Sequence, residues 1–127
     1  MNKRIVIVDD DESIRKTFFL ILNRKYRVYL AKDAREALDR FKYANVDLII
    51  ADYMLPDLNG VELVSRFRKI GYAGDVILIS AHPDRVRRED LARLNIGDLF
   101  VKPLDLESLN LSIDRLLGSK QDLEKSV

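Results

Sequence analysis

Acidic residues, a serine and a lysine stand directly after four of the short apolar runs in this sequence. They are Asp9 and Asp10 after the first run, Asp52 after the third, Ser80 after the fourth and Lys102 after the fifth. Carboxylates that share one crevice repel one another unless a proton or a cation lies between them. A few carboxylates with open positions suit Mg²⁺, which keeps water ligands and accepts phosphate oxygens. With Lys102 and Ser80 as donors and an aspartate as the nucleophile, the set predicts phosphoryl chemistry.

Five apolar runs provide the expected strands that position these residues. Most runs are continuous and β-branched, as in strands covered on both faces, and they span residues 5–8, 28–31, 48–51, 76–79 and 99–101. Amphipathic stretches with apolar residues at helical spacing lie at residues 14–22, 34–41, 63–70 and 109–117.

A further stretch, around Val86, Leu91 and Leu94, is the weakest expected helix, because four arginines crowd it. Caps are expected near the helix starts, at Asp33, Asn59, Asp84 and Asp105.

Five β units that alternate with five α units predict an α/β fold, a parallel sheet doubly wound by helices in a (βα)5 arrangement. Right-handed crossovers gather the loops that follow the strands along one edge of such a sheet. Ligands bind at this edge, where the winding reverses. We therefore expect the polar residues after the strands to meet in one site.

Length and composition limit the classes of function. The 127 residues fit one domain, and the formal net charge of +1 gives no global field that would attract nucleic acid or an anionic membrane. No cysteine is present, which excludes thiolate chemistry. No apolar stretch approaches a membrane span, and the first apolar run begins too early for a signal peptide, so a cytoplasmic protein is expected. We expect a domain over residues 1–118 and a tail, or the start of a linker, over 119–127.

Four motifs in this order resemble the signature of response-regulator receiver domains, in the chemotaxis-receiver-like superfamily. The motifs are Val8-Asp9-Asp10, the stretch from Asp52 to Gly60 with Pro56 inside it, Ser80-Ala81 and Lys102-Pro103. The resemblance covers about residues 3–118 and implies the flavodoxin-like strand order 2-1-3-4-5.

The resemblance implies a role for each matched position. Asp52 would be the phosphoacceptor, Asp10 would bind Mg²⁺ directly, Asp9 would act mainly through water, and the backbone carbonyl of Met54 would complete the protein ligands. Ser80 and Lys102 would contact the phosphoryl oxygens, with a cis peptide between Lys102 and Pro103, and Pro56 and Gly60 would shape the loop after Asp52.

The implied function is a two-component signalling switch rather than an enzyme. A histidine kinase or a histidine phosphotransfer protein would donate the phosphoryl group to Asp52. The output would be a downstream protein target or an output domain absent from this sequence, and a phosphorylation-dependent dimer is possible. No direct binding to nucleic acid or membrane is expected.

One departure and two alternatives accompany this interpretation. The family usually has an aromatic residue where Leu99 stands, so the usual aromatic switch is not expected, and strand alternation points Phe100 to the opposite face. His82 is expected to be a loop residue near the site. One alternative is a receiver-like scaffold that never carries phosphate. The other is a small phosphatase of the haloacid dehalogenase type, with Asp9 as the nucleophile and Asp11 as the acid/base.

Overall fold

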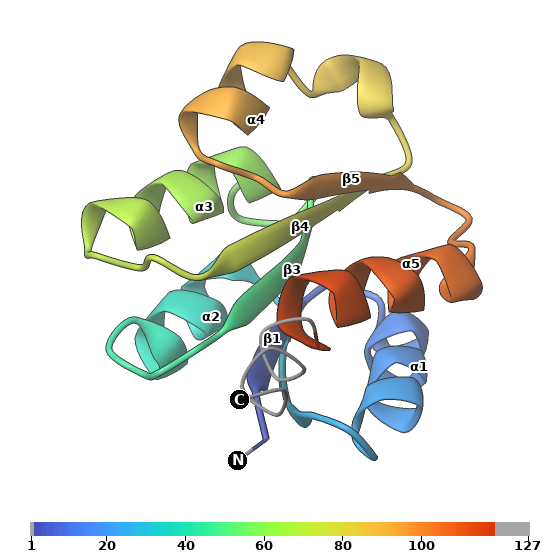
Figure 1. Cartoon of the computed structure of the whole chain (residues 1–127). Helices are drawn as coiled ribbons and strands as arrows, with labels where there is room; N and C mark the ends of the chain where they lie inside the picture. Colours follow the sequence, from blue (N-terminus) through green and yellow to red (C-terminus); the bar gives the residue numbers. More distant parts are fainter. Residues whose placement is uncertain (1, 119–127) are drawn as a thin grey trace.

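A five-stranded parallel sheet forms the centre of the protein, with the strands in the order β2-β1-β3-β4-β5 (Figure 1). The computed structural model describes residues 2–118, so the tail expected over residues 119–127 lies outside the described residues. The strands are β1 (Arg4–Val8), β2 (Arg27–Ala31), β3 (Leu48–Asp52), β4 (Asp75–Ser80) and β5 (Asp98–Val101). Both the fold class and the strand order predicted from the sequence are confirmed.

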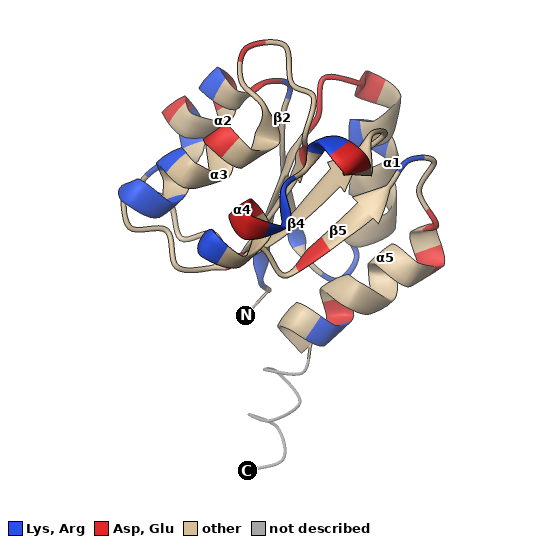
Figure 2. Ribbon diagram, turned by 90° about the horizontal axis from the view of Figure 1, so that it is seen from above, with Lys and Arg blue, Asp and Glu red and all other residues tan. Residues whose placement is uncertain are grey.

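Helices cover both faces of the sheet. They are α1 (Glu12–Leu22), α2 (Ala34–Phe41), α3 (Gly60–Lys69), α4 (Arg88–Arg93) and α5 (Leu106–Ile113), with a 3₁₀ turn, η1 (Pro83–Arg85), and a π-helical turn, η2 (Asp114–Gly118). Viewed from above, α1 and α5 lie on one side of the sheet and α2, α3 and α4 on the other (Figure 2). No helix within residues 2–118 is long and apolar enough to cross a membrane.

Alternate residues along the strands pack on opposite faces of the sheet, and each face carries a large apolar cluster. On β1, Ile5 and Ile7 pack with α1 and α5, whereas Val6 and Val8 pack with α2 and α3. These β1 residues are at most 1% exposed, because parallel strands between two helical layers have no solvent-facing side. The same alternation separates Leu99, which packs beside α4, from Phe100, which packs on the α1–α5 side, as predicted.

Three of the four predicted helix caps are confirmed. The side chains of Asp33, Asn59 and Asp105 accept backbone N–H groups in the first turns of α2, α3 and α5. The prediction for Asp84 was wrong, because Pro83 starts the separate turn η1 and the chain is extended again at Val86. The helix α4 therefore begins only at Arg88, beyond the predicted cap.

The helix α4 is the most weakly packed of the helices, as its arginine-rich sequence predicted. Its N-cap, Arg87, makes no side-chain capping bond, and none of the six residues of α4 is buried. Its apolar contacts come from the partly buried Leu91 and from Val86 and Leu94, which flank the helix and are 8% and 5% exposed.

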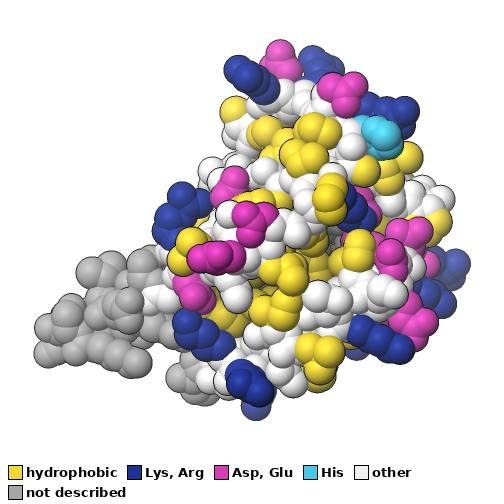
Figure 3. Space-filling view, turned by 90° about the vertical axis from the view of Figure 1, so that its right-hand side faces the viewer, with side chains coloured by type: hydrophobic (Ala, Val, Ile, Leu, Met, Phe, Trp, Pro, Cys, Tyr) yellow, Lys and Arg dark blue, Asp and Glu magenta, His cyan; other side chains and the backbone are white. Residues whose placement is uncertain are grey.

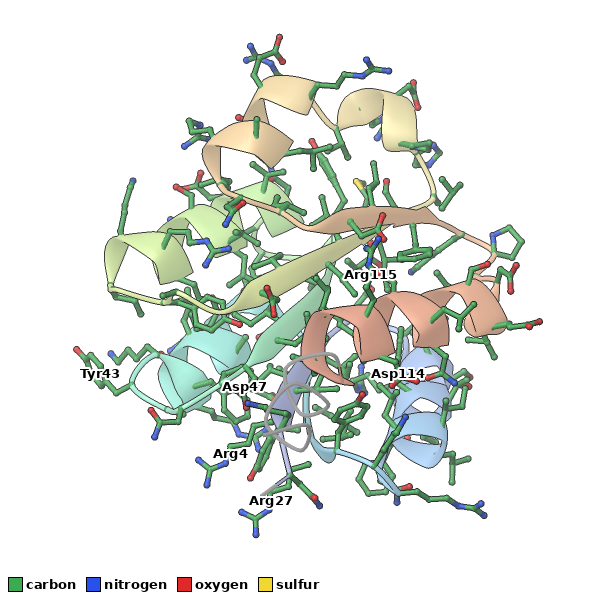
Figure 4. All side chains as sticks on the ribbon, in the orientation of Figure 1. Arg4, Arg27, Tyr43, Asp47, Asp114 and Arg115 are labelled. Carbon is green, nitrogen blue, oxygen red and sulfur yellow. The ribbon has the colours of Figure 1, made fainter. Side chains whose placement is uncertain are left out.

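A buried tyrosine fastens the end of α5 to the start of β2. The Tyr26 hydroxyl donates to Asp114 Oδ1 at 2.6 Å, and Lys25 Nζ donates to the other oxygen of that carboxylate at 3.1 Å. Asp114 lies at the end of α5, and Arg4, Arg27 and Asp47 lie near the amino ends of the strands (Figure 4). Burial and the bond to Asp114 raise the pKa of Tyr26, which keeps the phenol protonated as a donor.

We predict that Tyr26→Phe lowers the free energy of unfolding by about 1–2 kcal/mol, because the buried bond to Asp114 is lost while the ring remains. Urea denaturation followed by circular dichroism measures this change. Tyr43→Phe is the matched control, since the Tyr43 side chain is 85% exposed and its hydroxyl faces solvent. Equal stability of the two variants would contradict the structural role of the Tyr26 bond.

Candidate functional site

The residues predicted to do chemistry meet at the carboxyl ends of the strands. Asp9 directly follows β1, Asp52 and Ser80 are the last residues of β3 and β4, and Lys102 directly follows β5. Carboxylate oxygens of Asp9, Asp10 and Asp52 all lie within 4.8 Å of one another. This convergence follows from the strand order, because β1 lies beside β3 and β4 beside β5 in parallel register.

Lys102 joins the two buried carboxylates. Its ammonium lies 2.6 Å from Asp52 Oδ2 and 3.2 Å from Asp9 Oδ2, and the two aspartates are 4% and 1% exposed. The peptide bond between Lys102 and Pro103 is cis, as predicted. A single ammonium therefore neutralises part of the repulsion between two acids that the fold has withdrawn from water.

The local sequence around Asp9 orients its side chain. Asp9 Oδ1 accepts the backbone N–H of Asp11 at 2.9 Å, and Asp11 in turn caps α1 by accepting the N–H of Ser13. The Arg15 guanidinium donates to the backbone carbonyl of Asp9 at 2.7 Å. This contribution of Arg15 was missed from the sequence, because an arginine on a helix gives no signal that it reaches back to the preceding strand end.

Asp10 differs from its neighbour because it is exposed. The acidic stretch that leads into α1 is visible in Figure 2. Asp10 therefore faces solvent while its carboxylate remains within reach of Asp9 and Asp52. An exposed carboxylate beside two buried ones leaves one side of the cluster open to water or a ligand.

The loop between β3 and α3 folds back on itself directly after Asp52. Asp52 Oδ1 accepts the N–H of Met54 at 3.0 Å, and Met54 forms an isolated antiparallel bridge with Asn59. Gly60 follows this bridge and donates its N–H to the Tyr53 carbonyl at 2.8 Å. A Cβ atom on Gly60 would lie 2.6 Å from the Asp52 carbonyl oxygen, so only glycine permits this close approach.

Ser80 lies at the same edge but is not bonded to the carboxylates. It is fully buried, its carbonyl accepts the Lys102 N–H at 2.9 Å, and its hydroxyl accepts the backbone N–H of His82 at 2.9 Å. Among residues 2–118, the serine hydroxyl makes no hydrogen bond to Asp9 or Asp52. The structure thus brings Ser80 beside Lys102, with its hydroxyl turned to the loop that contains His82.

Burial and charge perturb the acids and the base of the site in opposite ways. Burial raises the pKa of Asp9 to about 6, and the nearby charge of Asp52 adds to this, while the N–H of Asp11 and the Lys102 ammonium oppose it. Burial acts to lower the pKa of Lys102, but the bond to Asp52 and the charges of both aspartates outweigh it and raise that pKa. The lysine therefore stays charged, whereas burial favours the protonated form of Asp9.

The donor set of the cluster fits a hard divalent cation. All side-chain ligands are carboxylate oxygens, and three carboxylates gather around one ammonium, so the cluster retains negative charge. Few protein oxygens and an open solvent side are typical of Mg²⁺ sites rather than of enclosed Ca²⁺ cages. The residues present could therefore hold such an ion.

A flavodoxin-like α/β sheet in the order 2-1-3-4-5, with an acidic cluster and one lysine at its carboxyl edge, defines the class of this protein. The chain belongs to the response regulator receiver domain family, whose model matches residues 5–114. It is thus a receiver domain of two-component signalling, which is a regulatory rather than a catalytic domain.

Curated relatives and solved structures agree with this family. The response regulator MprA of Mycolicibacterium vanbaalenii is 36% identical over 92% of this chain and 51% of its own length. The sporulation initiation phosphotransferase F of Bacillus subtilis is 27% identical over 96% of this chain and 99% of its own length. The structure of the response regulator TrrA from Thermotoga maritima in complex with Mg²⁺–BeF has a TM-score of 0.78 and 31% identity, covering 91% and 99% of the two chains. The chain spans half or less of the length of several other curated relatives that it matches.

We predict that Gly60→Ala destabilises the protein by about 1–3 kcal/mol, because the new methyl group overlaps the Asp52 carbonyl. Alanine would otherwise favour the first turn of a helix over glycine, so the expected sign is opposite to that of helix propensity. Urea denaturation measures the change. Gly97→Ala is the control, since its Cβ would meet no atom closer than 3.4 Å. A Gly60→Ala variant as stable as the parent would contradict the close approach.

We predict that Asp9→Asn raises the melting temperature at pH 8 without divalent cations by several degrees. The folded pKa of Asp9 is about 6 against an ordinary 3.8, so ionised Asp9 opposes folding, and the parent loses stability relative to the variant as the pH rises from about 4 to about 6. The difference should stay constant above that range, nearly vanish below pH 4 and shrink when Mg²⁺ is added. Thermal unfolding at pH 4 and 8 tests this, and a less stable variant at pH 8 would refute it.

Proposed function

We propose that Asp52 accepts a phosphoryl group from a histidine kinase or a histidine phosphotransfer protein in a Mg²⁺-dependent reaction, and that this switches partner binding. The observation that carries the proposal is the single ammonium of Lys102 between the buried carboxylates of Asp52 and Asp9. The Lys102 ammonium already contacts the Asp52 carboxylate, so it would also lie close to the phosphoryl oxygens that Asp52 would acquire.

The bonds that form and break in the transfer involve only groups of this chain and of its donor. An oxygen of the Asp52 carboxylate bonds to phosphorus while the bond between phosphorus and the donor's histidine nitrogen breaks. That nitrogen keeps the electron pair, and Asp52 becomes an acyl phosphate. The N–H of Met54 holds one Asp52 oxygen and Lys102 the other, so the carboxylate is oriented before the donor arrives.

Asp9, Asp10, Asp52 and the backbone carbonyl of Met54 would hold the Mg²⁺ ion. When bound, the ion supplies positive charge that offsets the phosphoryl oxygens and the acidic cluster. The open side at exposed Asp10 leaves room for water and phosphate oxygens. The likeness to the TrrA structure, which contains Mg²⁺–BeF, supports the same ion here.

Ser80 and Lys102 would respond to the new group. The Ser80 hydroxyl accepts the N–H of His82 in the unphosphorylated protein, and turning it toward phosphoryl oxygens would release that loop bond. The loop leads into η1 and the weakly packed α4, so a small change at Ser80 would shift these segments at little cost in buried contacts. Leu99 takes the position of the usual aromatic residue, so switching would proceed through this loop and α4 without an aromatic swing.

A hollow of about 280 Å³ beside Lys102 supports docking of the donor there. It lies between α1 and the loop after β5, and its apolar lining is formed by Ile14, Phe18, Pro103, Leu104 and Leu106. Figure 3 faces α1 and α5 and shows hydrophobic side chains gathered among charged ones on this side. A donor helix seated in this hollow would bring its histidine to the open side of the acidic cluster.

We predict that incubation with acetyl phosphate and Mg²⁺ labels Asp52, and that Asp52→Asn removes the label completely because an amide cannot form the acyl phosphate. Intact-protein mass spectrometry and peptide mapping read this out. Asp39→Asn is the control and should label normally, since Asp39 is an exposed residue of α2 that pairs with Arg35 and is not part of the acidic cluster.

Other outcomes of this experiment would overturn the proposal. Label at Asp9 would favour the phosphatase alternative. A folded protein that takes no label and shows no spectral change with beryllofluoride and Mg²⁺ would favour the phosphate-independent scaffold.

A further inference from the structure

An aspartate at the tip of the loop after β3 reaches across to the start of α2. Asp57 Oδ1 accepts the backbone N–H of Ala34 at 3.1 Å, and Asp57 Oδ2 accepts the N–H of Arg35 at 2.9 Å. The acceptor and the two donors are 23 and 22 residues apart in the sequence. The carboxylate therefore forms a two-point clamp between elements that the chain connects only through β3.

These two bonds complete the start of α2. The first four N–H groups of a helix have no partner inside it. In α2 these groups belong to residues 33–36, since the N–H of Ala37 makes the first intrahelical bond, to the Asp33 carbonyl at 3.2 Å. The side chain of Asp33 accepts the N–H of Glu36 at 2.8 Å, and Asp57 accepts those of Ala34 and Arg35. The loop thus supplies the acceptors for two of the three N–H groups that side chains cap at this helix end.

The clamp also restrains the loop that begins with Met54. The base of the loop is closed by the bridge between Met54 and Asn59, and Asp57 Oδ1 accepts the N–H of Leu58 at 3.0 Å within the tip. The bonds inside the loop fix its conformation, whereas the bonds of Asp57 to α2 fix its orientation relative to the helix. The positive end of the helix dipole strengthens this attachment to a carboxylate.

Charge favours the clamp at neutral pH. Slight burial acts to raise the pKa of Asp57, but backbone N–H groups of Arg35, Ala34 and Leu58 lower it overall. The carboxylate is therefore ionised and can accept from both helix donors at once.

We propose that Asp57 is a positioning residue for the metal site: by clamping the loop tip to α2, it fixes the loop that carries the carbonyl of Met54, whose N–H is already bonded to Asp52. This rests on the proposed function in taking Mg²⁺ as the ion and the Met54 carbonyl as one of its ligands. Asp57 itself would touch neither the ion nor the phosphoryl group. Mg²⁺ demands near-ideal octahedral geometry at short distances. A carbonyl on a loop whose orientation is not fixed therefore binds the ion poorly.

The test is Mg²⁺ affinity of the full chain, measured by calorimetric titration, together with the rate of labelling at saturating Mg²⁺. Asp57→Ala should raise the Mg²⁺ dissociation constant by about 10-fold, the lower end of what the loss of an outer-shell partner costs. The labelling rate at saturating Mg²⁺ should stay within about twofold of the parent, because Asp52 and Lys102 are untouched. Asp57→Asn retains one acceptor oxygen, so its Mg²⁺ dissociation constant should lie between those of the parent and Asp57→Ala.

Asp33→Ala is the matched control. It removes another side-chain cap from the same helix but leaves the loop attached, so it should lower the urea midpoint about as much as Asp57→Ala without weakening Mg²⁺ binding. A merely structural role of Asp57 would make the two variants alike in both measurements.

The outcomes separate this inference from the proposed function. If Asp57→Ala and the parent bind Mg²⁺ equally while Asp52 is labelled, the positioning role is overturned and the function stands. If Mg²⁺ binding weakens as expected but Asp52 takes no label, the function fails and the positioning role stands. A parent chain that binds no Mg²⁺ overturns both.

Discussion

The contact on which the site depends is the one between the Lys102 ammonium and two buried carboxylates. Asp9 and Asp52 lie at the ends of neighbouring strands in a nearly dry environment, where their mutual repulsion would otherwise oppose folding. Lys102 comes from the loop after β5, two strands away from β3. The three groups can therefore meet only when the strands are arranged in this order in the sheet. The fold thus creates an electrostatic conflict and places a cation to relieve part of it, leaving negative charge for a ligand to neutralise.

Much of this arrangement could be predicted from the sequence, because it depends on local patterns. Continuous β-branched runs identify strands buried on both faces, and parallel winding brings the residues that follow them to one edge. Asp52, Lys102 and the acidic pair at the end of β1 were found in this way, and the structure places them together. Alternation along β5 likewise separated Leu99 from Phe100 correctly.

The features that escaped prediction depend on contacts between distant segments or on backbone detail. The clamp from Asp57 to α2 joins residues that are close only because of the orientation of the loop after β3. No pattern of residue spacing in the sequence indicates this orientation. Asp84 was taken as a cap because its type fits, but the turn begun by Pro83 breaks the chain's path before α4 starts. The Ser80 hydroxyl accepts the backbone N–H of His82 instead of donating to a carboxylate of the cluster, and residue types alone do not decide between these partners.

Stability is unevenly distributed between the helices, and the packing of α4 shows where the protein is soft. Five residues of α3 are buried, whereas α4 has none and lies beside β5, the edge strand on that side of the sheet. Such a segment exchanges its amide hydrogens through local opening at a free-energy cost well below that of global unfolding. Local opening of this corner therefore breaks few buried contacts and leaves the well-packed helix α3 and the centre of the sheet in place.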